Sequence, residues 1–299
     1  MIHLVGDGIA GRLLAQWMLE SDLKFVQYGD GRTNTPPVGF VHLFQGRTFH
    51  RDAIEVEAFR RTIEFWRNES LASEWEVERS VAPGDRLDRS ADTETVPEEW
   101  RPVRVAPDLY RYGPGFTVQA GALGAAVPVE VVSRQVAFED LDGTVVHATG
   151  LAIQRLLPGY RWDINPGRTV QGVGSRLPER LYLKAGCHLG ADPDGRTLTV
   201  GGRVNSKGEA KDDETELAAQ ILGAPVRYES EWWGERIANA LDRWPLVGWL
   251  DETTFVFAGF GGRALFWLPY CCDLAVEALR SGSNAEIPER LRAGRFLES

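Results

Sequence analysis

Three glycines near the start of the chain have the spacing of a dinucleotide-binding turn. Gly6, Gly8 and Gly11 follow a short apolar run at residues 2–5 and open a segment with helical periodicity. The first glycine permits a tight turn, the second lets a pyrophosphate approach the backbone, and the third lets the helix pack closely on the strand. The helix N-terminus adds N–H donors and a positive dipole end. The pattern favours a dinucleotide site over a purely structural glycine turn.

The acidic residue expected to bind the ribose is displaced along the sequence. In this motif an acidic residue ends the second strand, about 20 residues after the first glycines. Here the strand-like run at residues 25–28 is followed by Gly29, and the carboxylate comes one residue later, as Asp30. Asp30 could reach the ribose from a shifted turn, or it could be an ordinary turn residue. The sequence leaves both possibilities open.

The rest of the chain alternates between helix-like and strand-like segments. Helical periodicity covers residues 9–23, 52–69, 212–222 and 265–279, and the clearest strand-like runs are 73–80, 101–112, 144–150, 168–174, 180–189, 226–233, 245–249 and 254–260. This order predicts an α/β fold in which a Rossmann-like domain is interleaved with a mostly antiparallel-sheet (α+β) substrate domain. We assign residues 1–46, 117–180 and 245–299 to the first domain and residues 47–116 and 181–244 to the second.

The composition narrows the class of protein. The 299 residues are 43% hydrophobic and 25% charged, as in soluble globular proteins, and the net charge of −10 argues against nucleic-acid binding by bulk electrostatics. We expect no membrane span, because no apolar run reaches about 18 residues, and no leader segment precedes the first strand. The three cysteines (Cys187, Cys271 and Cys272) include an adjacent pair that suits no disulfide, which favours a reducing cytoplasm. No Cys/His spacing predicts a metal site.

Five stretches together resemble the FAD-dependent D-amino-acid oxidase superfamily, which includes glycine oxidases, sarcosine oxidases and the oxidase domain of a tRNA-modifying enzyme. They are residues 6–11, 39–47, 145–150, 194–202 and a C-terminal set at 233–236, 242–248 and 259–269. The C-terminal set is the most specific, because its three pieces keep the family's order and nearly its spacing. Leu43 stands where the family motif has a proline, and residues 73–120 match no particular substrate specificity.

The resemblance implies that the first domain binds FAD. The pyrophosphate would lie at Gly6, Gly8 and Gly11, the backbone of Val136 would contact the adenine, and residues 39–41 would line the isoalloxazine. The loop 261–265 would present N–H groups to the flavin N1–C2=O edge, where a helix N-terminus suits the negative charge of the reduced ring. The cofactor-binding set is then Gly6, Gly8, Ile9, Ala10, Gly11, Gly29, Asp30, Gly39, Phe40, Val41, Val136, Thr149, Gly150, Gly261, Gly262, Arg263, Ala264 and Leu265.

Two arginines are the candidate catalytic residues. Arg236 occupies the position of the family's substrate-carboxylate arginine, a role that suits a planar guanidinium, although a structural pair with an acid such as Glu235 would also explain it. Arg263 lies in the flavin loop and could contact flavin or substrate, or pair with a surface acid. His42 and His50 are possible proton carriers, but isolated histidines are more often packing residues.

The resemblance therefore implies an FAD-dependent oxidoreductase that oxidises a C–N bond of a small amine or amino acid by hydride transfer to flavin. An oxidase acting on a modified tRNA base is an alternative, against which the net charge counts. A third possibility is a flavoprotein-derived binding or assembly subunit without turnover. A nicotinamide dehydrogenase would explain the first 30 residues but not the C-terminal stretches. The substrate, the electron acceptor and the oligomeric state are not encoded in any motif found here.

Overall fold

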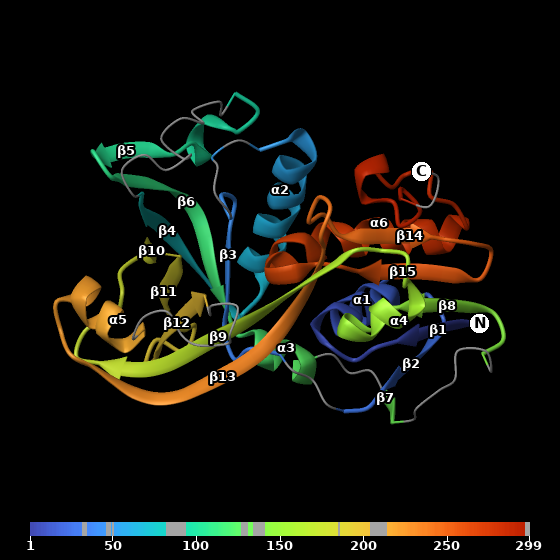
Figure 1. Cartoon of the computed structure of the whole chain (residues 1–299), viewed down its shortest axis with the longest axis horizontal. Helices are drawn as coiled ribbons and strands as arrows, with labels where there is room; N and C mark the ends of the chain where they lie inside the picture. The colour runs from blue at the N-terminus through green and yellow to red at the C-terminus, as the bar shows by residue number, and fades with distance from the viewer. Residues whose placement is uncertain are drawn as a thin grey trace. The chain divides into compact units, whose positions relative to one another are not determined.

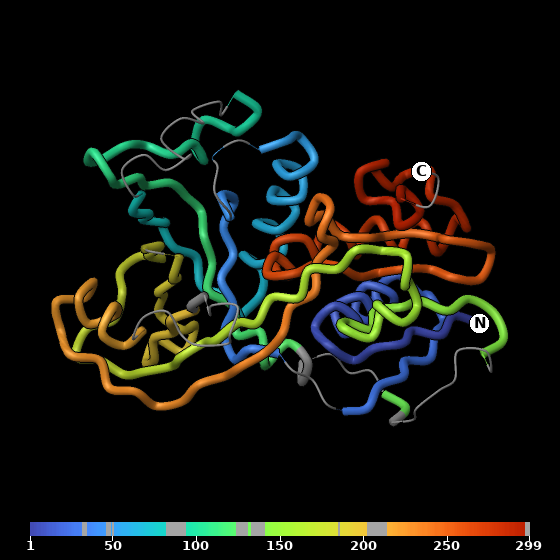
Figure 2. The backbone as a smooth tube through the Cα atoms, viewed as in Figure 1, coloured from blue at the N-terminus to red at the C-terminus, as the bar shows by residue number. Residues whose placement is uncertain are grey.

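The computed structural model describes residues 1–31, 35–45, 49, 51–81, 94–126, 131–133, 141–184, 186–203 and 214–296 (Figure 1). The chain divides into two compact units. Unit 1 comprises residues 1–35, 121–165 and 235–299, and unit 2 comprises residues 36–120 and 166–234. Both chain ends belong to unit 1, as the backbone path in Figure 2 shows, so the first strand and the last helix are parts of the same unit.

Unit 1 is built on a six-stranded sheet in the order β14-β15-β8-β1-β2-β7. Its strands are β1 (Ile2–Val5), β2 (Phe25–Gly29), β7 (Val131–Ser133), β8 (Thr144–His147), β14 (Leu246–Trp249) and β15 (Thr254–Ala258). All neighbouring pairs are parallel except β14 with β15. The parallel strands agree with the Rossmann-like domain that the strand–turn–helix–strand pattern of the first 30 residues predicts, and β14 adds an antiparallel edge that the pattern did not predict.

Two helices of unit 1 pack against each other. They are α1 (Ile9–Glu20) and α6 (Ala264–Ser281), joined by a hydrogen bond of 2.8 Å from Trp17 Nε1 to Asp273 Oδ1. The apolar face of α6 is buried and includes Cys271 and Cys272, whose thiol pKa values burial raises well above the ordinary range. These cysteines therefore act as small apolar core residues, as expected for a buried helix.

Unit 2 is built on a curled, nine-stranded, mostly antiparallel sheet in the order β13-β9-β12-β11-β10-β4-β6-β3, with β5 paired to β6. Its strands are β3 (Gly39–His42), β4 (Ala72–Ser80), β5 (Val103–Ala106), β6 (Leu109–Val118), β9 (Trp162–Gly174), β10 (Leu181–Lys184), β11 (Cys187–Ala191), β12 (Leu198–Arg203) and β13 (Val226–Asn239). Helix α2 (Ala53–Asn68) packs on β4, and α5 (Glu214–Leu222) packs on β12.

Short helical segments complete the fold. They are α3 (Ala120–Ala126), α4 (Ile153–Leu156) and the 3₁₀ turns Glu98–Trp100, Gly150–Ala152, Gly261–Arg263 and Glu289–Leu291. In the described part of the chain, no helix combines the length and the hydropathy that crossing a bilayer requires. The predicted fold class is confirmed: a parallel α/β sheet and a mostly antiparallel sheet are built from interleaved segments of one chain.

The unit boundaries differ from the predicted domain boundaries. Residues 36–46, 117–120 and 166–180, expected in the cofactor domain, belong to unit 2, and residues 235–244, expected in the substrate domain, belong to unit 1. The first two differences arise because β3 pairs antiparallel with β6, Phe40 opposite Thr117. The others arise because the chain passes between the units along two long strands, β9 and β13, instead of through loops. The assignment of cofactor and substrate to particular units stays a prediction.

Candidate functional site

The glycine turn has the steric requirements that its spacing predicts. Gly6 has a φ of 120°, and a Cβ added there would lie 2.2 Å from the carbonyl oxygen of Ala148. A Cβ at Gly11 would lie 2.1 Å from the carbonyl oxygen of Gly6. A Cβ at Gly8 would meet nothing within 4 Å. The first and third glycines are therefore required by the packing of the turn, whereas Gly8 leaves open space beside the start of α1.

The end of β8 completes this edge of the sheet. The amide of Ala148 donates to the carbonyl of Val5 at 2.8 Å, and a Cβ on Gly6 would lie 3.2 Å from the amide nitrogen of Thr149. Gly150 then turns the chain with a φ of 54°. Thr149 and Gly150, both predicted cofactor-binding residues, thus lie beside the glycine turn. His147, at the end of β8, is buried, and burial lowers its pKa to about 4, so it is neutral at pH 7.

Two helix N-termini lie at the same edge of this sheet. Helix α1 follows β1 and α6 follows β15, and both strands are parallel to β8, so their carboxyl ends share one edge. Neither helix has an acidic residue in its first turn or a side-chain hydrogen bond at its N-cap. Helix α2, by contrast, has a full capping box formed by Asp52 and Glu55. Neither α1 nor α6 is therefore capped by a side chain, and the positive end of each helix dipole lies at this edge, where it favours an anionic ligand.

Arg236 lies directly beside the glycine loop that opens α6. A Cβ added at Gly262 would be 3.1 Å from Arg236 Nη1, and an isolated bridge between Ala238 and Phe260 aligns the end of β13 with the loop. The structure thus brings together two predicted site residues, Arg236 and Gly262. Arg263, the second candidate, places its guanidinium 4.6 Å from the ring centroid of Phe266 and 5.2 Å from that of Trp267.

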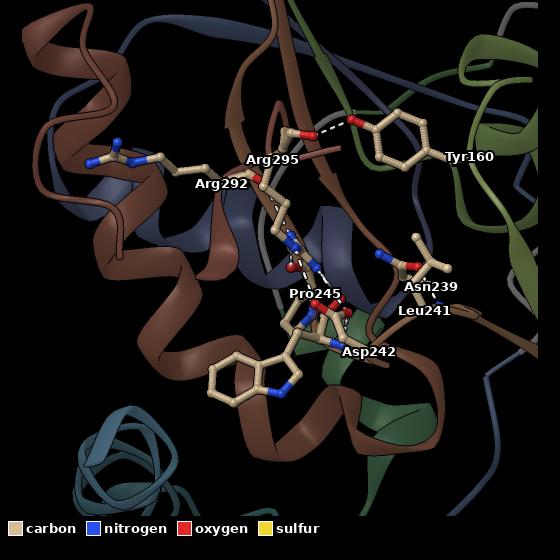
Figure 3. Close-up of polar contacts among 9 residues, drawn as sticks. Tyr160, Asn239, Leu241, Asp242, Pro245, Arg292 and Arg295 are labelled. Carbon is tan, nitrogen blue, oxygen red and sulfur yellow. Dashed lines mark hydrogen bonds and ion pairs between the residues drawn. The ribbon is translucent and has the colours of Figure 1, made fainter. Parts of the chain in front are cut away.

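A half-buried ion pair between Arg295 and Asp242 anchors the connection from β13 to β14, and with it the end of β13 (Figure 3). Arg295 donates from Nη2 to Asp242 Oδ1 and to the Trp244 carbonyl oxygen, each at 3.1 Å, and from Nη1 to the Pro245 carbonyl oxygen at 3.1 Å. The amides of Leu241 and Trp244 donate to the side chains of Asn239 and Asp242, both at 2.9 Å. Residues near the C-terminus therefore hold the 242–248 stretch that the resemblance singled out.

In unit 2, the side chains of β3 reach across the curled sheet. The Phe40 ring stacks on the His188 ring of β11, with centroids 5.5 Å apart, and a Cβ at Gly201 of β12 would lie 2.9 Å from Phe40 Cε2. His42 Nε2 is 3.3 Å from His188 Nε2, and the hydroxyl of Tyr112 is 3.2 Å from His42 Nδ1. Two strands at distant positions in the sheet are thus joined by a hydrogen-bonded row of three titratable side chains.

The protonation of this row is partly determined by Tyr112. Burial raises the pKa of Tyr112 to about 12, so its hydroxyl keeps its proton at neutral pH. Because Arg79 hydrogen-bonds to Tyr112 as a donor, the phenol proton is directed to His42 Nδ1. His42 is fully buried and His188 is half-buried. The hydrogen-bond direction therefore runs from Tyr112 through His42 to the half-buried end of the row at His188.

The predicted site residues fall in different parts of the fold. Those of unit 1 (Gly6, Gly8, Ile9, Ala10, Gly11, Gly29, Asp30, Thr149, Gly150 and residues 261–265) lie on the turns and strand ends described above, whereas Gly39, Phe40 and Val41 form β3 in unit 2. Val136, His50 and residues 46–48 lie outside the described residues. The sequence analysis did not single out His188 or Tyr112. The signal available for His188 was its place on the same strand face as Gly190, two residues later in β11.

No metal cluster is found in what the structure describes: no three His, Cys, Asp or Glu side chains there are grouped to hold an ion. A parallel sheet with a glycine turn is interleaved with a curled, mostly antiparallel sheet, and solved amine and amino-acid oxidases share this fold, so the predicted resemblance is confirmed at the level of the fold. No protein-family model and no curated protein sequence matches the chain.

Solved structures with this fold cover the chain almost end to end. Iminodiacetate oxidase from Chelativorans sp. BNC1 matches with a TM-score of 0.72 and 16% identity, over 98% of each chain. L-amino acid deaminase from Proteus vulgaris matches with a TM-score of 0.72 and 12% identity, over 99% of this chain and 93% of the deaminase chain. Glycine oxidase from Geobacillus kaustophilus matches with a TM-score of 0.70 and 16% identity, over 96% of each chain. At these identities the similarity establishes the fold alone.

Proposed function

We propose that this chain is an FAD-dependent oxidoreductase that oxidises a C–N bond of a small amine or amino acid. The observation that carries the proposal is the position of Arg236 beside the loop that opens α6, at the same carboxyl edge of the parallel sheet as the glycine turn. The fold is shared with an iminodiacetate oxidase and a glycine oxidase, whose named substrates contain such a bond.

The residues of unit 1 fit the dinucleotide part of FAD. The space beside Gly8, which a Cβ would enter without meeting another atom, is where a pyrophosphate can approach the N–H groups of residues 9–11. The 261–265 loop leads into α6, whose N-terminus adds the positive end of a second helix dipole. When bound, FAD supplies the two-electron acceptor that oxidation of a C–N bond to an imine requires. The assignment of residues 39–41 to the flavin ring stays a prediction.

Arg236 is the proposed ligand of a substrate carboxylate. Its guanidinium is half-buried and rests against Gly262, where a larger residue would compete for the same space. A planar guanidinium binds a carboxylate through two parallel N–H···O bonds, which fixes the substrate's orientation as well as its affinity. An amino acid held in this way presents its Cα–N bond in a defined direction, and alignment is the main requirement of this type of oxidation.

The decisive experiment is the visible absorption spectrum of the purified protein, before and after FAD is added. We expect flavin bands that decrease under anaerobic conditions on addition of one member of a panel of glycine, sarcosine, iminodiacetate, proline and simple amines. The matched variant Gly8→Ala should fold normally, because its Cβ meets nothing within 4 Å, but should bind FAD weakly. A colourless protein whose thermal midpoint FAD does not raise would contradict the proposal and favour a binding or assembly subunit.

Oxidation of a modified tRNA base remains the alternative within the same chemistry. It predicts retention on tRNA at moderate salt, against the net charge of −10. If the flavin binds but no amine or amino acid reduces it, and tRNA is retained, this alternative replaces the amine substrate.

A further inference from the structure

The carboxylate of Asp7 occupies the space that the side chain of residue 29 would otherwise fill. Asp7 is the second residue of the glycine turn and is only 6% exposed. A Cβ added at Gly29, the last residue of β2, would lie 2.2 Å from Asp7 Cγ and 2.4 Å from Asp7 Oδ2. Glycine at position 29 and aspartate at position 7 are therefore sterically linked: a side chain at 29 excludes the observed position of Asp7.

In dinucleotide-binding sheets, the position at the end of the second strand usually binds the ribose of the cofactor. An acidic residue at the end of the second strand accepts hydrogen bonds from the adenosine ribose hydroxyls. Here that strand ends in Gly29, and the next residue, Asp30, is exposed. Because Asp7 overlies Gly29, its carboxylate stands at the carboxyl end of β2 although it comes from a different loop.

We infer that Asp7 is the residue that binds the adenosine ribose hydroxyls of the cofactor, a role transferred from the end of β2 into the glycine turn. The inference rests on the proposed function, since it requires an adenine dinucleotide at this edge. A carboxylate has about four lone-pair directions on two oxygens, so one that accepts a backbone N–H retains further acceptor positions for hydroxyl groups.

The protein holds this carboxylate in place from several sides. The amide of Gly31 donates to Asp7 Oδ2 at 2.9 Å, and Arg12 Nε donates to the Asp7 carbonyl oxygen at 2.7 Å. Gln27 Nε2 also donates, at 2.9 Å, to the carbonyl oxygen of Gly6, the residue before Asp7. Arg12 on α1 and Gln27 on β2 thus hold the backbone around Asp7, and Gly31, just beyond β2, holds its carboxylate before any ligand binds, which limits the entropy lost on binding.

The inference also specifies the cofactor class. A carboxylate accepts hydroxyl donors and repels a phosphate in the same position. The site should therefore take nucleotides with a free ribose 2′-hydroxyl, such as FAD and ADP, and should reject those with a 2′-phosphate.

The test uses the full-length apoprotein and measures FAD affinity by fluorescence, with ADP and 2′-deoxy-ADP as competitors. We expect Asp7→Asn to weaken FAD about ten- to a hundredfold, the range for losing hydrogen bonds to a charged group, and to abolish the preference for ADP over 2′-deoxy-ADP. Glu20→Gln, an exposed carboxylate at the other end of α1, serves as the matched control. The double variant Asp7→Gly/Gly29→Asp should recover the preference, whereas Gly29→Asp alone should not.

The outcomes separate this inference from the proposed function. A wild-type protein that does not bind FAD overturns both. A wild-type protein that binds FAD, with Asp7→Asn equally tight and equally selective, overturns the inference alone. Loss of selectivity in Asp30→Asn instead of Asp7→Asn would assign the ribose to Asp30 and would overturn it as well.

Discussion

At the scale of single residues, the neighbours of Arg236 explain how it could discriminate between substrates. The guanidinium rests against Gly262, and the strand that carries it is aligned with the α6 loop by the Ala238–Phe260 bridge. A fixed guanidinium contributes to binding only when the ligand has a matching anion. The proposed role therefore predicts an effect that depends on the substrate's carboxylate.

We expect Arg236→Gln to raise KM for an amino-acid substrate about 10- to 100-fold, the range for losing a charge-assisted hydrogen-bonded pair. The KM for the corresponding amine without a carboxylate should change little. Arg236→Lys should recover only part of the loss, because an ammonium cannot bind bidentately. Steady-state kinetics with the paired substrates provide the measurement, and Arg227→Gln, on the same strand and 76% exposed, is the control. Equal losses for both substrates would indicate a structural role.

His147 makes a residue-scale contribution to stability that depends on pH. Burial lowers its pKa to about 4 in the folded state, against 6.5 for the ordinary group, and the charge of Asp251 only partly opposes the shift. Between these pH values the unfolded state binds more protons than the folded state, so stability falls as pH decreases from about 6.5 to about 4.

Over this pH interval we expect the protonation of His147 alone to lower the free energy of unfolding by about 3 kcal/mol. His147→Leu removes the titration, so its free energy of unfolding should decrease less than that of the wild type over the same interval. Urea denaturation of both proteins at pH 7, 5.5 and 4.5 measures the difference, in which the contributions of carboxylates common to both proteins cancel. Parallel pH profiles would show that folding does not lower the pKa of His147.

At the scale of elements, the periodicity of the sequence predicted the helices and strands that depend on neighbouring residues. The strand–turn–helix–strand unit and the C-terminal helix, expected at 265–279 and found at Ala264–Ser281, follow from the spacing of apolar residues and glycines. β13 continues through Gly234 to Asn239, beyond the predicted 226–233, because it pairs with the similarly long β9, which is distant in the sequence. The His42–His188 contact joins residues 146 apart and depends on the curl of the sheet. Asp7 could not be placed without the register of β1 against β2, Val5 opposite Tyr28.

The contacts of Arg295 with Asp242 and the nearby carbonyls join the C-terminal segment to the β13–β14 connection, and losing them should lower the free energy of unfolding. Its side chain is 8% exposed and is paired with Asp242. Arg295→Met leaves Asp242 and three backbone carbonyls without this donor, so the free energy of unfolding should fall by about 3 kcal/mol. Arg60→Met, from an exposed pair with Glu57 on α2, should change it by less than about 1 kcal/mol. Urea denaturation measures both changes, and a change of less than about 1 kcal/mol for Arg295→Met would mean that the anchor adds little net stability.

At the scale of the whole molecule, the proposed cofactor edge is assembled from three separate parts of the chain. The glycine turn comes from the first segment of unit 1, residues 148–150 from the second and residues 261–265 from the third. Each follows a strand of the same sheet, so they meet only when β1, β8 and β15 are all paired. A ligand bound at this edge should therefore stabilise segments that are remote in sequence and adjacent in space.

Amide hydrogen exchange tests this directly. With FAD at about 100 times its Kd, opening that requires release of the ligand should slow by up to about 100-fold. We expect protection at residues 6–11, 148–150 and 261–265 together, and little at α2 or α5, which belong to unit 2. Protection limited to residues 6–11 would show a nucleotide held by the first turn alone, and the role proposed for the α6 loop would then be wrong.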